Sequence, residues 1–176
     1  GLLPTAAQKP AELGITPHIM AKIKHAQASH AGQDIPDIAK TIEADGVPFE
    51  PPCALITGGE LLVTVGEETG VGGRNQEYAL SAATRIAGSR RIVMAGVDTD
   101  GTDGPGGYFA ADNGNIPCLA GGIVDGETMQ EATATGVDIV AELRRHNTSA
   151  ALWKLKSGIA ATQNISLTDL GVTLIQ

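Results

Sequence analysis

Residues 91–105 read Arg-Ile-Val-Met-Ala-Gly-Val-Asp-Thr-Asp-Gly-Thr-Asp-Gly-Pro, and the expected fold follows from this stretch. Its first part, Arg91–Gly96, is short, apolar and ended by glycine, which is typical of a buried strand. Three aspartates, Asp98, Asp100 and Asp103, follow on the loop that leaves this strand. Open α/β sheets present ligand-binding groups at the ends of their strands. The stretch therefore predicts an α/β fold with an acidic loop at the end of a core strand.

The acidic loop has two interpretations. Three neighbouring carboxylates repel one another and stay ionised only when a cation or several N–H donors face them. As a site, Asp98, Asp100 and Asp103 would hold Mg²⁺, or one of them would accept a proton from a substrate hydroxyl. As a plain turn, the loop needs no ligand, because Asp and Gly dominate turns for backbone reasons. An EF-hand is discounted, since its regular ligand spacing and closing glutamate are absent.

A second stretch, Gly72–Glu77, consists of a glycine pair followed by an arginine, two amides and a carboxylate. It leads into the clearest helical pattern of the chain, which predicts a helix over residues 75–87. Glycines let the backbone approach a ligand closely, a helix N-terminus favours anions, and the planar fork of Arg74 suits a carboxylate or phosphate. A small anionic substrate is one interpretation. In the other, Arg74 pairs with Glu77 or with the acidic loop and only braces the fold, and Asn75 is the N-cap.

The two stretches are expected to meet in space. The predicted helix leads through a short turn into the strand over residues 91–96, so the two elements run antiparallel and are of similar length. The start of the helix then lies beside the end of the strand. We therefore expect the Arg74 guanidinium close to the carboxylates of Asp98, Asp100 and Asp103.

The remaining pattern alternates strands and helices, which predicts a three-layer α/β sandwich with a mixed or mostly parallel sheet. A proline-rich connector over residues 48–52 is the candidate boundary between two parts, and residues 106–118 are expected to form a long loop. Further helices are expected over residues 5–13, 33–44, 127–134, 138–145 and 149–155. Further strands are expected over residues 16–20, 53–57, 61–65 and 167–175.

The composition excludes several classes of partner and compartment. The formal net charge is −8, which argues against nucleic acid and against an anionic membrane surface. No apolar run approaches the ~20 residues that cross a bilayer, and the first residues given lack the charged-then-apolar pattern of a signal peptide. Cys53 and Cys118 have no metal-binding spacing and are expected as free thiols in a reducing compartment. The protein is expected to be cytoplasmic. No nucleotide-binding fingerprint is visible.

The three segments Gly72–Glu77, Asp98–Pro105 and Ala120–Gly126 resemble motifs of the MOFRL domain, and Pro51–Glu60 and His146–Ser149 support the match. That domain is the C-terminal part of the glycerate 2-kinase family, whose members are often labelled hydroxypyruvate reductases. The resemblance implies that residues 51–176 form this domain. It also implies that residues 1–50 are the end of the family's N-terminal, Rossmann-like domain.

The resemblance further implies ATP-dependent phosphorylation of D-glycerate to 2-phosphoglycerate with Mg²⁺, in a cleft between two domains. The family's first domain, with its catalytic lysine, has no counterpart here, so the isolated chain is expected to be inactive. The implied roles fall into three sets. Catalysis is expected of Arg74, Asp98 and Asp103, substrate binding of Arg74, Asn75, Glu77 and Thr99, and metal binding of Asp98, Asp100 and Asp103.

Two other functions stay open. One is reduction of hydroxypyruvate with NAD(P)H, which rests on the family's label alone. The other is a non-catalytic module that binds a small anion and forms a homodimer. The segments over residues 106–119 and 164–169 are longer than is usual in the family. Either segment can reshape a substrate cleft, so the substrate is less well determined than the family.

Overall fold

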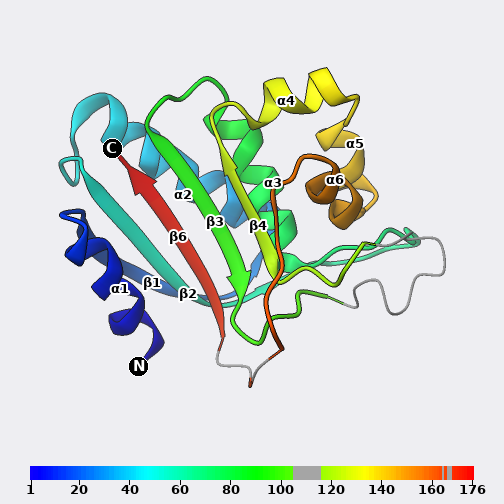
Figure 1. Ribbon diagram of the computed structural model, residues 1–176, viewed down its shortest axis with the longest axis horizontal. Coiled ribbons are helices and arrows are strands. Elements are labelled where there is room, and N and C mark those ends of the chain that lie inside the picture. Colours follow the sequence, from blue (N-terminus) through cyan, green and yellow to red (C-terminus); the bar gives the residue numbers. More distant parts are fainter. Residues whose placement is uncertain (105–115, 164, 166–167) are drawn as a thin grey trace.

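The computed structural model describes residues 1–104, 116–163, 165 and 168–176, which form an α/β fold around one six-stranded sheet (Figure 1). The strands are β1 (Thr16–Gln27), β2 (Cys53–Leu62), β3 (Ile92–Asp98), β4 (Gly121–Asp125), β5 (Gly158–Ile159) and β6 (Asp169–Ile175). The helices are α1 (Leu2–Glu12), α2 (Ala28–Asp45), α3 (Arg74–Ile86), α4 (Thr128–Thr135), α5 (Ile139–Arg144) and α6 (Thr148–Lys154).

The sheet is mixed, as predicted. Its order is β1-β2-β6-β3-β4-β5, in which β1 and β2 are parallel and all other neighbours are antiparallel. The last strand of the chain, β6, therefore lies in the middle of the sheet, between β2 and β3. This position places the start of β6 beside the end of β3, because antiparallel neighbours run in opposite directions.

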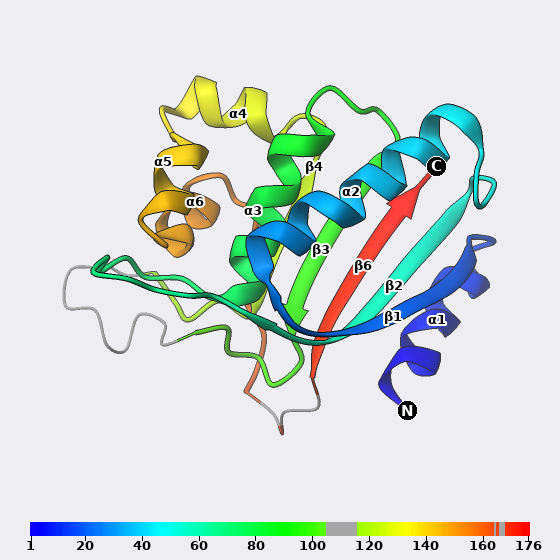
Figure 2. The ribbon, with the colours of Figure 1, turned by 180° about the vertical axis from the view of Figure 1, so that it is seen from behind.

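Helices cover both faces of the sheet. Figures 1 and 2 show α2 and α3 across one face, with α4, α5 and α6 grouped beside α3. Of the described helices, α1 alone lies on the other face. Successive strand residues point to opposite faces, and in β2 the space over Gly58 is filled by Leu3 of α1 whereas Thr57 faces Tyr78 of α3. The three-layer arrangement is thus complete only where α1 covers β1 and β2.

The main core lies between the sheet and the pair α2 and α3. Its apolar residues are aliphatic and small, as the scarcity of aromatics requires, and α3 contributes Ala79, Ala82, Ala83 and Ile86 to it. A second, smaller cluster joins Leu80 to α4, α5 and α6. Close contact between α3 and β3 depends on Gly96, where an added Cβ would lie 2.7 Å from the Tyr78 ring. Among the described residues, no helix is long and apolar enough to cross a membrane.

Several predicted elements differ from those observed. The two strands expected over residues 53–57 and 61–65 are one strand, β2, which continues through Gly58 and Gly59. It does so because β1 and β6 pair with it on both sides across these glycines. Gly59 has φ +121°, and an added Cβ would lie 1.9 Å from the Ile23 carbonyl oxygen, so only glycine fits there. The strand expected over residues 16–20 extends to Gln27, and the short strand β5 was not predicted.

Residues 1–50 share the sheet and the main core with the rest of the chain. β1 is the parallel neighbour of β2, and α2 packs on α3. The origin of these residues in a Rossmann-like domain stays a prediction. The long loop expected over residues 106–118 falls mostly outside the described residues.

Candidate functional site at the start of α3

Three elements converge on one polar site: the start of α3, the end of β3 and the start of β6. Arg74 is the first residue of α3, Asp98 is the last residue of β3, and Asp169 is the first residue of β6. Asp98 and Asp169 are direct partners across the two strands. The helix and strand run antiparallel as predicted, and Arg74 reaches both aspartates.

Arg74 is clamped between these two carboxylates. Its Nε donates to both oxygens of Asp169 at 2.9 Å, and its Nη2 donates to Asp98 Oδ2 at 2.7 Å. Burial by itself lowers the pKa of Arg74, but the hydrogen bond to Asp169 and the surrounding carboxylates outweigh it and raise the pKa. A guanidinium has five N–H donors, and only two are used by the described residues. The other three N–H donors have no partner among the described residues, and the Arg74 side chain as a whole is 28% exposed.

Asp103 caps helix α3 from a distant part of the chain. Its Oδ1 accepts hydrogen bonds from the Asn75 backbone N–H and Nδ2 at 3.1 Å, and its Oδ2 accepts one from the Gln76 N–H at 2.8 Å. The prediction that Asn75 is the N-cap was wrong, because Gly73 occupies that position and has no side chain to cap the helix. An added Cβ on Gly73 would lie 2.3 Å from Asp103 Oδ2, so the glycine makes room for the carboxylate.

The Asp103 carboxyl is fully buried, and burial raises its pKa to about 6 although several N–H groups oppose the shift. Its oxygens face the helix rather than a cleft. The catalytic and metal-binding roles predicted for Asp103 therefore do not match its surroundings. Its observed contacts are those of a helix cap that positions the first turn of α3, including Arg74.

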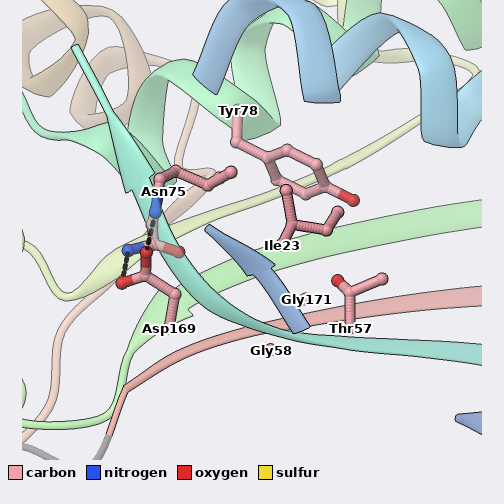
Figure 3. Close-up of a pocket in the computed structure, with 8 residues that line it drawn as sticks. Ile23, Thr57, Gly58, Asn75, Tyr78, Asp169 and Gly171 are labelled. Carbon is pink, nitrogen blue, oxygen red and sulfur yellow. Dashed lines mark hydrogen bonds between the residues drawn. The ribbon is translucent and has the colours of Figure 1, made fainter. Parts of the chain in front are cut away.

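Asn75 joins the cap to the clamp. Its Nδ2 donates to Asp103 Oδ1 and also to Asp169 Oδ1 at 2.9 Å, and Asp169 Oδ2 accepts from the Leu61 N–H at 2.8 Å (Figure 3). Asn75 itself is 1% exposed. The substrate contact predicted for Asn75 is therefore not supported by its position, and the residue instead orients the carboxylate behind Arg74.

The next two residues of α3 bind the loop after β3, the first turn of α6 and the loop before α6. Gln76 donates to the Asp103 carbonyl oxygen at 3.0 Å and accepts from Ser149 Oγ at 2.7 Å. Glu77 Oε2 lies 2.9 Å from His146 Nδ1, and Glu77 is buried. Glu77 thus forms a carboxylate–imidazole pair with His146, and the substrate contact predicted for Glu77 stays a prediction.

The loop after β3 is held by its own side chains. The Asp100 N–H donates to Asp98 Oδ1 at 3.2 Å, and the Thr102 N–H and hydroxyl donate to Asp100 Oδ1 at 2.7 and 2.9 Å. These contacts from Thr102 lower the pKa of Asp100, whereas burial raises the pKa of Asp98. The Thr99 hydroxyl, a predicted substrate contact, donates to the Thr168 carbonyl oxygen at 2.7 Å.

The predicted Mg²⁺ set does not fit this geometry. Asp103 points its oxygens at backbone N–H groups, Asp98 binds Arg74, and Asp100 binds Thr102. Within the described ranges, no three His, Cys, Asp or Glu side chains are arranged so that they could hold a metal ion. We therefore assign no metal to Asp98, Asp100 and Asp103.

Sequence reasoning missed the role of Asp169, which binds Arg74 although 95 positions separate the two residues. The sequence offered one signal. Asp169 lies near the start of a predicted strand, and Asp98 lies just after the end of another. Nothing local indicated that these two strands are neighbours. His146 and Ser149 were noted as part of a motif, but their contacts with α3 were not predicted.

Comparison with known proteins finds relatives that are named as glycerate kinases or as hydroxypyruvate reductases. The chain is 40% identical over 149 residues to the glycerate 2-kinase of Pyrococcus horikoshii, which is 85% of this chain and 31% of that protein. A relative from Agrobacterium vitis with the provisional name hydroxypyruvate reductase is 31% identical over 150 residues, covering 85% of this chain and 36% of its own. The crystal structure of glycerate kinase from Thermotoga maritima superposes with a TM-score of 0.88 at 34% identity.

That superposition covers 99% of this chain and 40% of the Thermotoga chain. The chain thus spans roughly a third of the length of the curated relatives it matches. The sequence profile described as the MOFRL family matches residues 53–169, which include every residue of the Arg74 site. The chain therefore belongs to the MOFRL family.

Proposed function

We propose that this chain supplies the substrate-holding part of a glycerate 2-kinase, which phosphorylates D-glycerate with ATP. One observation carries the proposal: Arg74 is fixed by Asp98 and Asp169, and three of its N–H donors have no partner in the part of the chain that the structure describes. A guanidinium fork matches a carboxylate in two parallel hydrogen bonds, which orients the ligand as well as binding it. The glycerate 2-kinase of Pyrococcus horikoshii supports the choice of substrate.

The charge around Arg74 favours a hydroxy acid over a simple anion. One guanidinium faces the carboxylates of Asp98, Asp169 and the nearby Asp100, so a lone anion would meet surplus negative charge. A hydroxyl group beside the ligand's carboxylate can donate to Asp98 or Asp100 and offset this repulsion. Glycerate carries such a hydroxyl on C2 and a second hydroxyl on C3.

The reaction needs a group that receives the hydroxyl proton. The 2-hydroxyl oxygen of glycerate attacks the γ-phosphorus of ATP, the bond from that phosphorus to the bridging oxygen of ADP breaks, and the hydroxyl proton leaves. We assign the proton to Asp98 at the end of β3. Its side chain is only 4% exposed, but its carboxylate keeps acceptor capacity beyond the hydrogen bonds from Arg74 and the Asp100 N–H. Burial raises the pKa of Asp98, which makes it a better base than an exposed aspartate. Arg74 would stabilise charge that develops during transfer.

The nucleotide and its Mg²⁺ are not assigned to residues of this chain. Phosphoryl transfer depends on groups that position both reactants, and the matched relatives are about three times longer than the aligned part. We propose that a domain corresponding to the rest of those relatives completes the site, and that the 176-residue chain alone has no turnover. The cytoplasmic location and the homodimer stay predictions.

The test separates binding from turnover. D-glycerate is titrated into the chain by calorimetry and by NMR, with Arg74→Lys as the test variant and Arg85→Lys as the matched control. Arg85 lies on the same helix and makes only an exposed pair with Asp37 at 3.8 Å. We expect binding that is lost in Arg74→Lys, since lysine lacks the fork, and kept in Arg85→Lys. Equal binding by both variants would contradict the role of Arg74.

A coupled assay with ATP, Mg²⁺ and D-glycerate then compares the chain with the full-length protein that carries it. Turnover only by the full-length protein is expected. A parallel assay with hydroxypyruvate and NAD(P)H tests the second candidate, which the name of the Agrobacterium relative favours. Reductase activity lost in Arg74→Lys, without kinase activity, would replace our proposal.

A further inference from the structure

The Tyr78 hydroxyl is the one fully buried polar side-chain atom without a hydrogen-bond partner among the described residues. Tyr78 lies on α3, one turn after Arg74, and is 3% exposed. Burial raises the pKa of the phenol, so the group stays a neutral O–H. The Thr173 hydroxyl lies near enough to oppose part of this rise in pKa, but it does not meet the geometry of a hydrogen bond with Tyr78 Oη. A buried hydroxyl without a partner costs about 1–3 kcal/mol, so it is expected to find one.

A small cavity lies beside this residue, between α3 and strands β1, β2 and β6. It leaves ≈ 10 Å³ in which the centre of a water molecule can lie, which is about the space that one water needs. Ile23 and Leu61 give it apolar walls, and Asn75 and Asp169 form the wall toward the Arg74 site. Figure 3 shows the Tyr78 ring reaching from the helix toward Thr57, with Asn75 and Asp169 on the other side of the cavity.

A second hydroxyl borders the same space. Gly171 of β6 has no side chain, and an added Cβ there would lie 2.4 Å from Thr57 Oγ1 and 3.6 Å from Tyr78 Oη. Both hydroxyls therefore approach the space that the glycine leaves open, yet they form no hydrogen bond with each other. A water molecule needs two to four polar partners to be held in a cavity, and two hydroxyls meet that requirement.

A cation is a poor occupant. Asp169 is the charged residue in the cavity wall, and its oxygens already accept hydrogen bonds from Arg74, Asn75 and the Leu61 N–H. The molecule in the cavity should therefore be neutral and able both to donate and to accept hydrogen bonds.

We propose that one water molecule occupies this cavity, hydrogen-bonded to Tyr78 Oη and Thr57 Oγ1. It ties α3 to β2 directly behind the Asn75–Asp169 contact that orients Arg74. Tyr78 and Thr57 are thus positioning residues, which hold the helix at its distance from the sheet without touching a substrate. The proposal is independent of the reaction that the site performs.

The test uses thermal unfolding of the chain with Tyr78→Phe, Thr57→Val and the double variant. If the water is present, each single change removes one of its partners and lowers Tm by about 2–4 °C. The decrease in Tm of the double variant is then smaller than the sum of the two single decreases. Thr57→Ser, which keeps the hydroxyl, should retain the coupling. A Tyr78→Phe variant as stable as the parent or more stable, or purely additive changes, would overturn the proposal, because removing an unpaired buried hydroxyl is neutral or stabilising.

A high-resolution crystal structure of the parent chain distinguishes a bridging water molecule from a direct hydrogen bond between the two hydroxyls. Density for one water within hydrogen-bond distance of Tyr78 Oη and Thr57 Oγ1, and its loss in Tyr78→Phe, is the expected result. Empty density, or a direct hydroxyl–hydroxyl hydrogen bond, would show that the site does not bind water.

Discussion

Arg74 Nε lies 2.9 Å from both carboxylate oxygens of Asp169, the first residue of the last strand. This contact joins the start of α3 to the middle of the sheet and leaves the outer part of the guanidinium free. Because Asp169 is itself held by Asn75 and the Leu61 N–H, it is a fixed support for Arg74 rather than a flexible surface partner.

Asp169→Asn is expected to lower the free energy of unfolding by about 2 kcal/mol, because a buried arginine contact loses its charge partner. The amide N–H₂ of asparagine would also face one of the donors that now bind Asp169. Urea unfolding measures the change. Asp37→Asn removes the exposed partner of Arg85 and should cost at most about 0.5 kcal/mol. Equal losses in the two variants would show that the clamp contributes nothing to the fold.

The raised pKa of Asp103 predicts that the free energy of unfolding depends on pH. The change falls between pH 3.8, the ordinary pKa of the group, and about 6, its pKa in the folded chain. A raised pKa means that the folded chain binds the proton more tightly than the unfolded chain. Its contribution is therefore complete below about pH 4 and is lost as the pH rises through 6. The loss amounts to about 3 kcal/mol, at 1.36 kcal/mol per pH unit.

The measurement compares the free energy of unfolding of the parent and of Asp103→Asn from pH 3.5 to 7.5. Asparagine does not ionise, so the difference between the two curves isolates Asp103 from Asp98 and Asp100. We expect the parent to lose stability relative to the variant as the pH rises through 6. Parallel curves would show that burial does not raise the pKa of Asp103.

Gly73→Ala is expected to lower the free energy of unfolding by about 1–3 kcal/mol. The added Cβ would lie 2.3 Å from Asp103 Oδ2 and would push this capping carboxylate away from α3. The backbone of Gly73 is extended, so the cost is steric and not conformational. Gly66→Ala is the matched control, since its Cβ would meet only the end of the flexible Glu68 side chain. Thermal unfolding of the two variants checks this, and a smaller shift for Gly73→Ala than for the control would be inconsistent with a tight cap.

Glu77 and His146 are expected to be energetically coupled, because the Glu77 carboxylate is buried and His146 Nδ1 lies 2.9 Å from it. His146→Ala should cost about 1–3 kcal/mol by leaving that carboxylate without this partner. In a chain that already carries Glu77→Gln, His146→Ala should lower the free energy of unfolding by a smaller amount. A double-mutant cycle in urea measures the coupling, and a coupling near zero would mean that the pair does not hold the loop before α6.

Much of the local structure was predictable from the sequence. The helix from Arg74 to Ile86, the strand from Ile92 to Asp98 and the final strand all follow from hydrophobic periodicity. The strand end predicted at Gly96 was wrong, because β3 continues through this glycine to Asp98 and pairs there with β6. The closeness of Arg74 and Asp98 was predictable too, because a helix and the next strand joined by a short turn must run antiparallel. These features depend on residues near one another in the chain.

Only the tertiary structure decided what each acidic residue does. Asp103 caps α3 through the N–H of Asn75, 28 positions earlier, and Asp169 reaches Arg74 across 95 positions. The contact of Asp169 requires that β6 inserts between β2 and β3, and strand order is set by packing of the whole sheet rather than by any local pattern. The same packing makes β2 a single strand through Gly59 and turns three similar aspartates into a cap, a clamp and a turn.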